Sequence, residues 1–187
     1  MSYSVAVEFR DMNADGKQEA IISRYNNGYA NNRKPDVVVT AYANPEGVYE
    51  QLDGIDDVEG NDGVDENDAF TYSVAAELAS KLVGLSSVGG GRQYSFILIS
   101  AERKTLEEKP AEVRVNLFNT SNTDLSQPDA VVTLNINDAG YYKVLEPSQG
   151  NNEFDIDADG DGDSDANDKS IFVKIATSFV SMRNFAD

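Results

Sequence analysis

The residues of this sequence with the clearest chemical potential are aspartates at alternate positions of one short segment, "DADGDGDSDAND", residues 157–168. A calcium loop needs several oxygen ligands that converge on one ion from alternate residues, with a glycine where the backbone turns sharply. The segment meets both requirements, because Gly162 stands at its sixth position. We therefore predict a calcium site whose ligands are Asp157, Asp159, Asp161, Asp163 through its main-chain carbonyl, Asp165 and Asp168.

A second acidic segment, "DVEGNDGVDEND" at residues 57–68, keeps most of the same ligand positions. Its sixth position is Asp62, and the glycine has moved one place further, to Gly63. A residue at the sixth position must tolerate a positive φ, which Asp does better than most residues other than glycine. We predict a second calcium site of weaker affinity, whose ligands are Asp57, Glu59, Asn61, Asp65 and Asp68.

A third segment, "DMNADGKQE" at residues 11–19, has the same spacing but leads into a predicted strand. In this respect it resembles the calcium-binding hairpin of integrin-type propeller blades, although a single such unit does not support a propeller. The alternative is a plain Asp-Gly turn between two strands. We predict a third calcium site, whose ligands are Asp11, Asn13, Asp15, Lys17 through its carbonyl and Glu19.

The two twelve-residue segments are each followed by residues with helical periodicity. On these residues the chain resembles the loop-helix half of an EF-hand and, more closely, the dockerin repeat, in which an aspartate commonly closes the loop. The resemblance covers about twenty residues each time and implies bound calcium. A different interpretation makes Asp65 with Asp68, and Asp165 with Asp168, helix N-caps. That interpretation leaves Asp157, Asp159 and Asp161 unexplained, because their like charges repel unless an ion lies between them.

The composition excludes several other functions. The 187 residues include 33 Asp and Glu against 15 Lys and Arg, a formal net charge of −18. A field of this sign repels phosphate groups and anionic lipid, so we expect no nucleic-acid partner and no insertion into membranes. Cys and His are absent, which removes thiolate zinc sites, cysteine nucleophiles and serine triads with a histidine base. We therefore expect a protein that is not an enzyme.

The chain contains an internal repeat. The segment "PDVVVTAYANPEGVYEQLD" from Pro35 matches "PDAVVTLNINDAGYYKVLE" from Pro128, with a common Pro-Asp start, Val-Thr strand and turn glycine. The two acidic segments, and the strands that begin at Tyr3 and Tyr94, match in the same order. We predict a tandem duplication, with a first unit at 1–83, a Gly/Ser-rich linker at 84–93 and a second unit at 94–187.

Each unit reads as four mostly antiparallel strands, a calcium loop and one helix, so the predicted fold class is β-rich α+β. "NPEG" and "NDAG" supply hairpin turns. The helices should pack on the sheets through one face each, formed by Phe70, Val74, Leu78 and Leu82 in the first and by Ile171, Ile175, Phe179 and Met182 in the second. The predicted strands are 3–9, 19–25, 36–43, 47–52, 94–100, 111–118, 129–136 and 140–146.

Sites built from protein oxygens leave little room for substrate, so these ions should fix loops and not activate water. Weak Asp-rich loops need millimolar calcium, which places the protein outside cells. The first residues carry no signal peptide pattern. We expect a structural building block of an extracellular assembly, best matched by a virion component such as a phage capsid, decoration or tail protein, with self-assembly or other protein partners. The alternative is an adhesion or dockerin-like module of a secreted protein that binds a scaffold or carbohydrate.

Overall fold

The computed structural model describes most of the chain, and it contains eight strands and two helices. The strands are β1 (Ser2–Arg10), β2 (Glu19–Tyr25), β3 (Val37–Ala43), β4 (Tyr49–Gln51), β5 (Tyr94–Glu102), β6 (Glu112–Asn119), β7 (Ala130–Ile136) and β8 (Tyr142–Val144), and the helices are α1 (Glu66–Ser86) and α2 (Ala166–Ser181). The described residues are 2–30, 33–46, 48–51, 57, 63–86, 94–105, 108–119, 121–122, 124–145 and 154–182.

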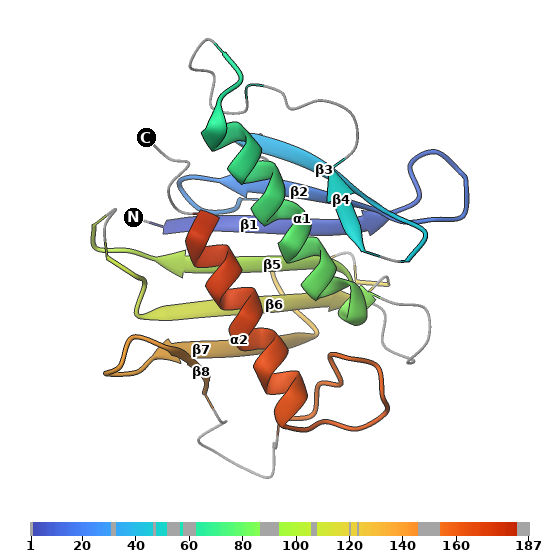
Figure 1. Ribbon diagram of the computed structural model, residues 1–187. Coiled ribbons are helices and arrows are strands. Elements are labelled where there is room, and N and C mark those ends of the chain that lie inside the picture. Colours follow the sequence, from blue (N-terminus) through green and yellow to red (C-terminus); the bar gives the residue numbers. More distant parts are fainter. Residues whose placement is uncertain are drawn as a thin grey trace.

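All eight strands belong to one open antiparallel sheet in the order β4-β3-β2-β1-β5-β6-β7-β8 (Figure 1). The prediction of a β-rich fold with mostly antiparallel strands is confirmed, and each predicted strand end lies within two residues of the observed one. β1 and β5 form the centre of the sheet, with Val5 opposite Ile99. The edge strands β4 and β8 have 3 residues each, and such short edges limit pairing with other sheets.

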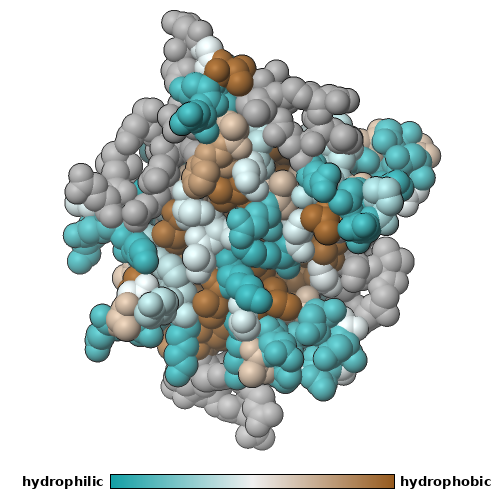
Figure 2. Space-filling model, viewed as in Figure 1, coloured by the Kyte–Doolittle hydropathy of each residue, from teal (hydrophilic) through white to brown (hydrophobic). Residues whose placement is uncertain are grey.

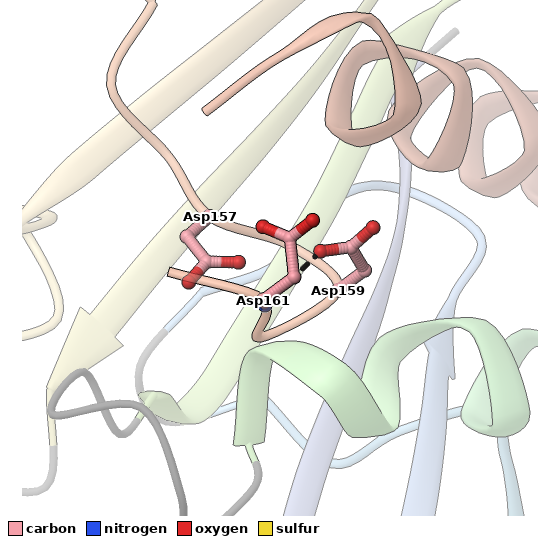
Figure 3. Close-up of side chains that lie close together, drawn as sticks. All are labelled: Asp157, Asp159 and Asp161. Carbon is pink, nitrogen blue, oxygen red and sulfur yellow. Dashed lines mark hydrogen bonds between the residues drawn. The ribbon is translucent and has the colours of Figure 1, made fainter. Parts of the chain in front are cut away.

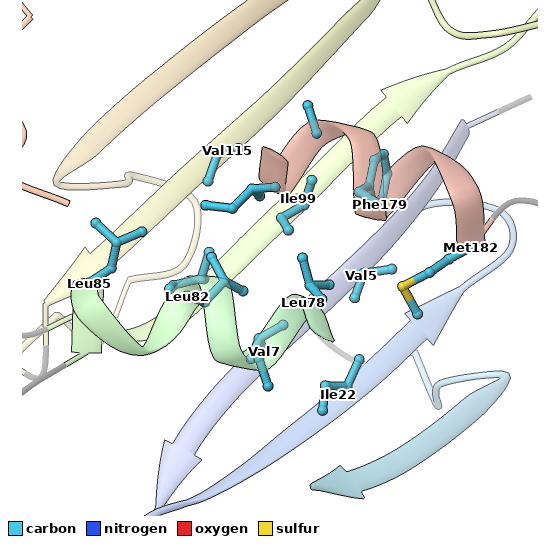
Figure 4. Close-up of a cluster of buried hydrophobic side chains, with 14 of the residues drawn as sticks. Val5, Val7, Ile22, Leu78, Leu82, Leu85, Ile99, Val115, Phe179 and Met182 are labelled. Atoms are coloured by element: carbon cyan, nitrogen blue, oxygen red, sulfur yellow. The ribbon is translucent and has the colours of Figure 1, made fainter. Parts of the chain in front are cut away.

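Both helices lie on the same face of the sheet and run antiparallel to each other (Figure 1). Successive side chains of a strand point to opposite faces, and Val5 and Val7 of β1 point toward the helices, while Ser4 and Ala6 between them are buried on the other face. Leu78 of α1 and Phe179 of α2 are fully buried against the two valines (Figure 4). The ring of Phe179 also stacks on Tyr3, with 4.6 Å between ring centroids. Residues from both halves of the sequence therefore share one hydrophobic core.

One residue of the predicted helix faces is placed wrongly. Phe70 was expected to face the core, but its side chain is 48% exposed. The buried face of α1 runs from Asp68 through Thr71 and Ala75 to Leu78. Phe70 lies at the flank of this face, where it lines a pocket together with Tyr141 and Val173. The predicted faces are otherwise buried or partly buried.

The predicted linker at 84–93 overlaps the end of α1, which continues to Ser86. Its remaining residues, 87–93, lie outside the described part of the chain.

Candidate metal centre

Two groups of aspartates converge in the loop that precedes α2. Asp157, Asp159 and Asp161 each offer a carboxylate oxygen, and these oxygens lie within 4.8 Å of one another (Figure 3). A second group with the same spread contains the side chains of Asp163, Asp165 and Asp168. Either group could hold a metal ion, although exposed acidic groups are also common in proteins without one. The six residues that the sequence assigned to one calcium site thus lie in two groups of three, and Asp163 takes part through its side chain and not through the predicted carbonyl.

The backbone of this loop is folded around its first aspartate. Asp157 accepts hydrogen bonds from the N–H groups of Gly160 (2.6 Å) and Gly162 (3.0 Å), one with each carboxylate oxygen. Both glycines have positive φ, 80° and 99°, which only glycine adopts without strain. Further along, Asp159 Oδ1 accepts from the N–H of Asp161 at 3.2 Å, and Asp161 Oδ1 accepts from Asp163 at 3.1 Å. These bonds orient alternate carboxylates within one turn of the chain.

Asp168 ties the beginning of the loop to the start of α2. Its carboxylate is 1% exposed, and Oδ1 accepts from the N–H of Ala158 at 2.6 Å while Oδ2 accepts from the N–H of Asp165 at 2.6 Å. Asp165 is the N-cap residue, and its side chain accepts from the N–H of Asn167 at 2.6 Å. The N-cap interpretation of this pair is thus confirmed. It does not compete with metal binding, since a carboxylate has several lone pairs.

The electrostatics of the loop favour a cation. Loss of hydration on burial, together with the negative charges of Asp161, Asp168 and Asp157, raises the pKa of Asp159 above its ordinary value of 3.8. Repulsion from Asp161 is the main cause of the raised pKa of Asp163. Both carboxylates therefore lie in a field that opposes their ionisation. A bound divalent cation would reverse that field, so the residues present fit a metal ion.

The loop packs against α1, which belongs to the other half of the sequence (Figure 3). A Cβ added to Gly84 would lie 2.3 Å from the carbonyl oxygen of Ala158, a distance that no real side chain tolerates. Ala158 stands between two of the metal-binding candidates and is 1% exposed. The contact is one that sequence reasoning missed. A glycine inside a helical segment was the available signal, because such a glycine often marks a close backbone approach.

The loop after β1 repeats this backbone arrangement. Asp11 accepts from the N–H of Asp15 (3.2 Å) and Gly16 (2.9 Å), Asn13 accepts from Asp15 (3.0 Å), and Asp15 accepts from Lys17 (2.8 Å). The bonds from position six to one, five to three and seven to five therefore occur in both loops. Both loops lie beyond the strand ends at the right of the view in Figure 1. There they form hydrophilic clusters on the surface (Figure 2).

Glu19, the last predicted ligand of the loop at 11–19, is 3% exposed and accepts a hydrogen bond from the N–H of Met12 at 2.6 Å. It lies on β2, which begins at this residue. Among the described residues, three or more acidic oxygens converge only in the loop before α2, so Asp11, Asp15 and Glu19 do not form such a group.

Only part of the loop before α1 can be compared. Asp68 is fully buried, and its Oδ2 accepts from the N–H of Asp65 at 2.8 Å, as Asp168 does from Asp165. Asp57 is half-buried. The other two predicted ligands of this loop, Glu59 and Asn61, lie outside the described residues.

Comparison with known protein families, curated proteins and solved structures finds no match to this chain. Neither α1 nor α2 is long and apolar enough to cross a membrane.

Proposed function

We propose that this chain is a calcium-binding structural module without catalytic activity, in which calcium fixes the loop before α2. The observation that carries the proposal is the convergence of Asp157, Asp159 and Asp161 within 4.8 Å. Calcium takes six to eight oxygen ligands in a flexible geometry, whereas Mg²⁺ demands a strict octahedron and keeps several waters. A loop of closely spaced carboxylates and main-chain carbonyls suits calcium better. The local resemblance to EF-hand and dockerin loops supports the same choice.

The same proposal extends to the two other loops. In the loop after β1 the hydrogen bonds from Gly16 to Asp11 and from Lys17 to Asp15 repeat those of the loop before α2, which supports a second site. We expect its affinity to be lower because Asn13 replaces a carboxylate and Glu19 already accepts a backbone N–H. The loop before α1 is proposed as a third site on its sequence and on the Asp65–Asp68 contact.

Calcium in such sites acts on stability. With free calcium at about 100 times its dissociation constant, one site adds about 2.7 kcal/mol to the free energy of unfolding. For a chain of this size, that corresponds to a rise of about 5–10 °C in melting temperature. We expect removal of calcium with a chelator to lower the melting temperature by this amount, measured by circular dichroism. An unchanged melting temperature would contradict the proposal.

Substitution of Asp159 separates calcium binding from ordinary destabilisation. In Asp159→Asn the amide oxygen can still accept from Asp161, but the charge is lost. We expect calcium binding to weaken at least about tenfold, or about 1.4 kcal/mol, by titration calorimetry. Without calcium the variant should be no less stable than the natural chain, because its repulsion with Asp161 and Asp157 is gone. The control is Asp138→Asn, which removes one exposed charge outside all three loops.

We further propose that the chain arose by tandem duplication, because several contacts recur in the two halves. Asp36 accepts from the N–H of Asn26 at 2.7 Å, and Asp129 accepts from the N–H of Asn119 at 2.8 Å. These are the aspartates of the two Pro-Asp sequences, and each joins the strands on either side of it.

The hairpins support the same origin. The hydroxyl of Tyr49 donates to the carbonyl of Gln18 at 3.0 Å, and that of Tyr142 donates to the carbonyl of Pro110 at 2.8 Å. In both cases the tyrosine begins the short edge strand and its partner lies just before the strand two places further into the sheet.

The wider role that fits a calcium-stabilised sheet is that of a building block in an extracellular assembly. We propose a virion component, such as a capsid, decoration or tail protein of a phage, in which the partners are copies of this chain or other proteins of the particle. The calcium loops support this role, since their expected weak affinity needs the millimolar calcium found outside cells. Electron microscopy of the purified protein in calcium tests it, and a population of ordered rings, tubes or shells is the expected result.

A second candidate function is the binding of carbohydrate or a scaffold protein, as in an adhesion or dockerin-like module. It is supported by a pocket of about 380 Å³ between the helices and the β7–β8 hairpin. Two aromatic residues at this pocket, Phe70 and Tyr141, are 48% and 71% exposed. Exposed aromatic rings are common binding surfaces. Binding to a glycan array or an isolated scaffold domain that is lost in Tyr141→Ser would favour this function over the assembly role.

A further inference from the structure

The face of the sheet opposite the helices carries an uncharged row of residues that crosses six strands. No described helix lies on this face, because α1 and α2 both cover the other one (Figure 1). The register places the members of the row next to one another from β3 to β7. In order across the sheet they are Val38, Ser23, Ala6, Leu98, Asn116 and Val131.

The outer members of this row are unusually exposed for branched apolar residues. Val38 is 48% exposed and Val131 is 50% exposed. They lie at matching positions, since each is on the third strand from the β1–β5 centre of the sheet. An interface between identical copies is isologous, so it uses a patch that complements itself under a two-fold rotation. A two-fold rotation can place Val38 of one copy against Val131 of the other, so this row meets that condition.

The two rows beside it are nearly as free of net charge. On one side Glu8 lies between Ile21 and Phe96, and on the other side Arg114 lies between Ser100 and Thr133. These are the only charged residues of the two rows within β1, β2, β3, β5, β6 and β7. In a chain of net charge −18, these three rows within the strands carry no net charge, and exposed Asp36 and Asp129 lie just outside them, two positions before Val38 and Val131.

One end of the face is aromatic. The ring of Tyr29, from the loop after β2, lies 5.9 Å from Phe96, and Phe96 lies 5.5 Å from Phe118. The backbone N–H of Tyr29 donates to Ser4 Oγ of β1 at 3.2 Å, which fixes this loop on the same face. Phe118 is 1% exposed, so Tyr29 and Phe96, which are partly exposed, are the rings that a partner can reach, and aromatic residues are enriched in protein interfaces.

The face is large enough for a stable contact. Six strands about 4.8 Å apart, with about seven residues each at about 3.3 Å, cover about 650 Å². Ser4 and Ala6 on this face are already buried, at 2% and 3% exposed, so two copies would bury less than twice this area, about 1,000 Å² in total, which is at the lower end of specific protein interfaces.

We propose that a second copy of this chain docks on this face, sheet against sheet, to form a two-fold dimer. The inference names the partner and the surface for the proposed assembly role and rests on that role, but it does not depend on calcium. Sheets packed face to face lie about 10 Å apart with their side chains interdigitated. The exposed valines at both ends of the row would then be covered together with Leu98 at its centre.

The test is analytical ultracentrifugation of the full chain over a wide concentration range, in calcium and in chelator. We expect a mass of twice 20.3 kDa in both conditions. Raising the ionic strength from about 0.01 M to about 0.15 M shortens the Debye length from about 30 Å to about 8 Å, so dimerisation should tighten as repulsion between the acidic copies is screened.

The double variant Val38→Lys/Val131→Lys should weaken the dimer at least about tenfold, about 1.4 kcal/mol, by placing four like charges in the contact. Its melting temperature as a monomer should be unchanged, because both side chains are exposed. The matched control is Phe70→Lys/Tyr141→Lys, which adds the same charge at exposed apolar residues on the helix side. This control should remain dimeric.

A natural chain that stays monomeric at the highest concentration, or a dimer that only the helix-side control disrupts, would overturn the inference. A monomer whose melting temperature still falls in chelator overturns the dimer while the calcium proposal stands. A dimer with no response to chelator supports the inference and contradicts the calcium proposal.

Discussion

Ala14 has a backbone conformation that glycine adopts at the equivalent place in the loop before α2. Its φ is 61°, and Gly160, also the fourth residue of its loop, has a φ of 80°. A left-handed conformation costs a residue with a Cβ about 1–2 kcal/mol. Ala14→Gly should relieve this strain, but glycine also gains about 0.4–1 kcal/mol of entropy in the unfolded chain. We expect a net stabilisation of up to about 1 kcal/mol in urea unfolding.

The reverse change, Gly160→Ala, should destabilise the protein by up to about 1 kcal/mol, because the added Cβ meets nothing within 4 Å and the strain is offset only in part by the lower entropy of the unfolded chain. Ala139→Gly serves as the control, since Ala139 lies in a turn without positive φ. That substitution should destabilise slightly. Stabilisation by both alanine-to-glycine changes would contradict the assignment of strain to Ala14.

The raised pKa values of Asp159 and Asp163 predict opposite responses to pH with and without calcium. In the calcium-free protein the folded state holds these protons more tightly than the unfolded chain. Their contribution to the free energy of unfolding therefore rises as pH falls through the raised pKa values toward 3.8. With calcium bound, the carboxylates are held ionised, so stability is lost as pH falls and protons displace the ion.

Urea unfolding between neutral pH and about pH 4, in calcium and in calcium-free buffer, measures the two slopes. The window excludes Asp124 and Asp129, whose pKa values are lowered by hydrogen bonds from Ser126 and Asn119. Their stabilising contribution is present above 3.8 and is lost only at lower pH. In the double variant Asp159→Asn/Asp163→Asn the calcium-free slope should become flatter. Equal slopes in the two buffers would contradict a metal site.

Spacing predicted that the aspartates of the loop before α2 lie close together, but it did not predict their division into two groups of three. Alternate carboxylates and a glycine restrict the backbone so strongly that the N–H of Gly162 donates to the carboxylate of Asp157 within the same loop. The contact of Ala158 with Gly84 could not be predicted in this way, because it joins residues far apart in the sequence. The local sequence determines the backbone conformation of the loop, whereas its contact with α1 depends on tertiary packing.

At the level of elements, α1 supports the loop before α2 through Gly84. In Gly84→Ala the new methyl group would lie 2.3 Å from the carbonyl oxygen of Ala158, so helix and loop must separate. Forcing an extra carbon into a packed contact costs about 1–3 kcal/mol. We expect this loss of stability, together with weaker calcium binding by titration calorimetry, although no ligand is changed.

Gly63→Ala is the matched control for Gly84→Ala, because a Cβ at Gly63 meets nothing within 4 Å. It should leave calcium binding to the loop before α2 unchanged. If Gly84→Ala lowers stability but leaves calcium affinity intact, then α1 does not position the loop.

Alternation of apolar residues predicted strands such as β7 well because one face of the strand is buried, whereas central β1 is buried on both faces from Tyr3 to Val7. It could not predict that β1 pairs with β5, since alternation specifies a face and not a neighbour. For α1 the helical period predicted Leu78 and Leu82 on the core face. It misplaced Phe70, because hydrophobicity marks an apolar residue but not the limit of the sheet that covers it.

At the scale of the whole molecule, the two halves of the sequence are joined through three kinds of contact. β1 and β5 share a ladder of backbone pairs at the centre of the sheet. Tyr3 of the first half stacks on Phe179 of the second. Gly84 meets Ala158 at a metal-binding candidate. Calcium bound in the loop before α2 would therefore stabilise the first half as well as the second.

The last prediction concerns unfolding of the entire chain. Because the buried residues of both halves form one core, we expect a single cooperative transition in which the calorimetric and van't Hoff enthalpies agree. Calcium should move the whole transition to higher temperature without splitting it. The excised segments 1–83 and 94–187 should fail to fold alone, since each would expose the central edge of the sheet and lose the Tyr3–Phe179 stack. Two resolved transitions, or a folded segment 94–187 with natural calcium affinity, would instead indicate that each unit folds independently and that the β1–β5 ladder forms only after both have folded.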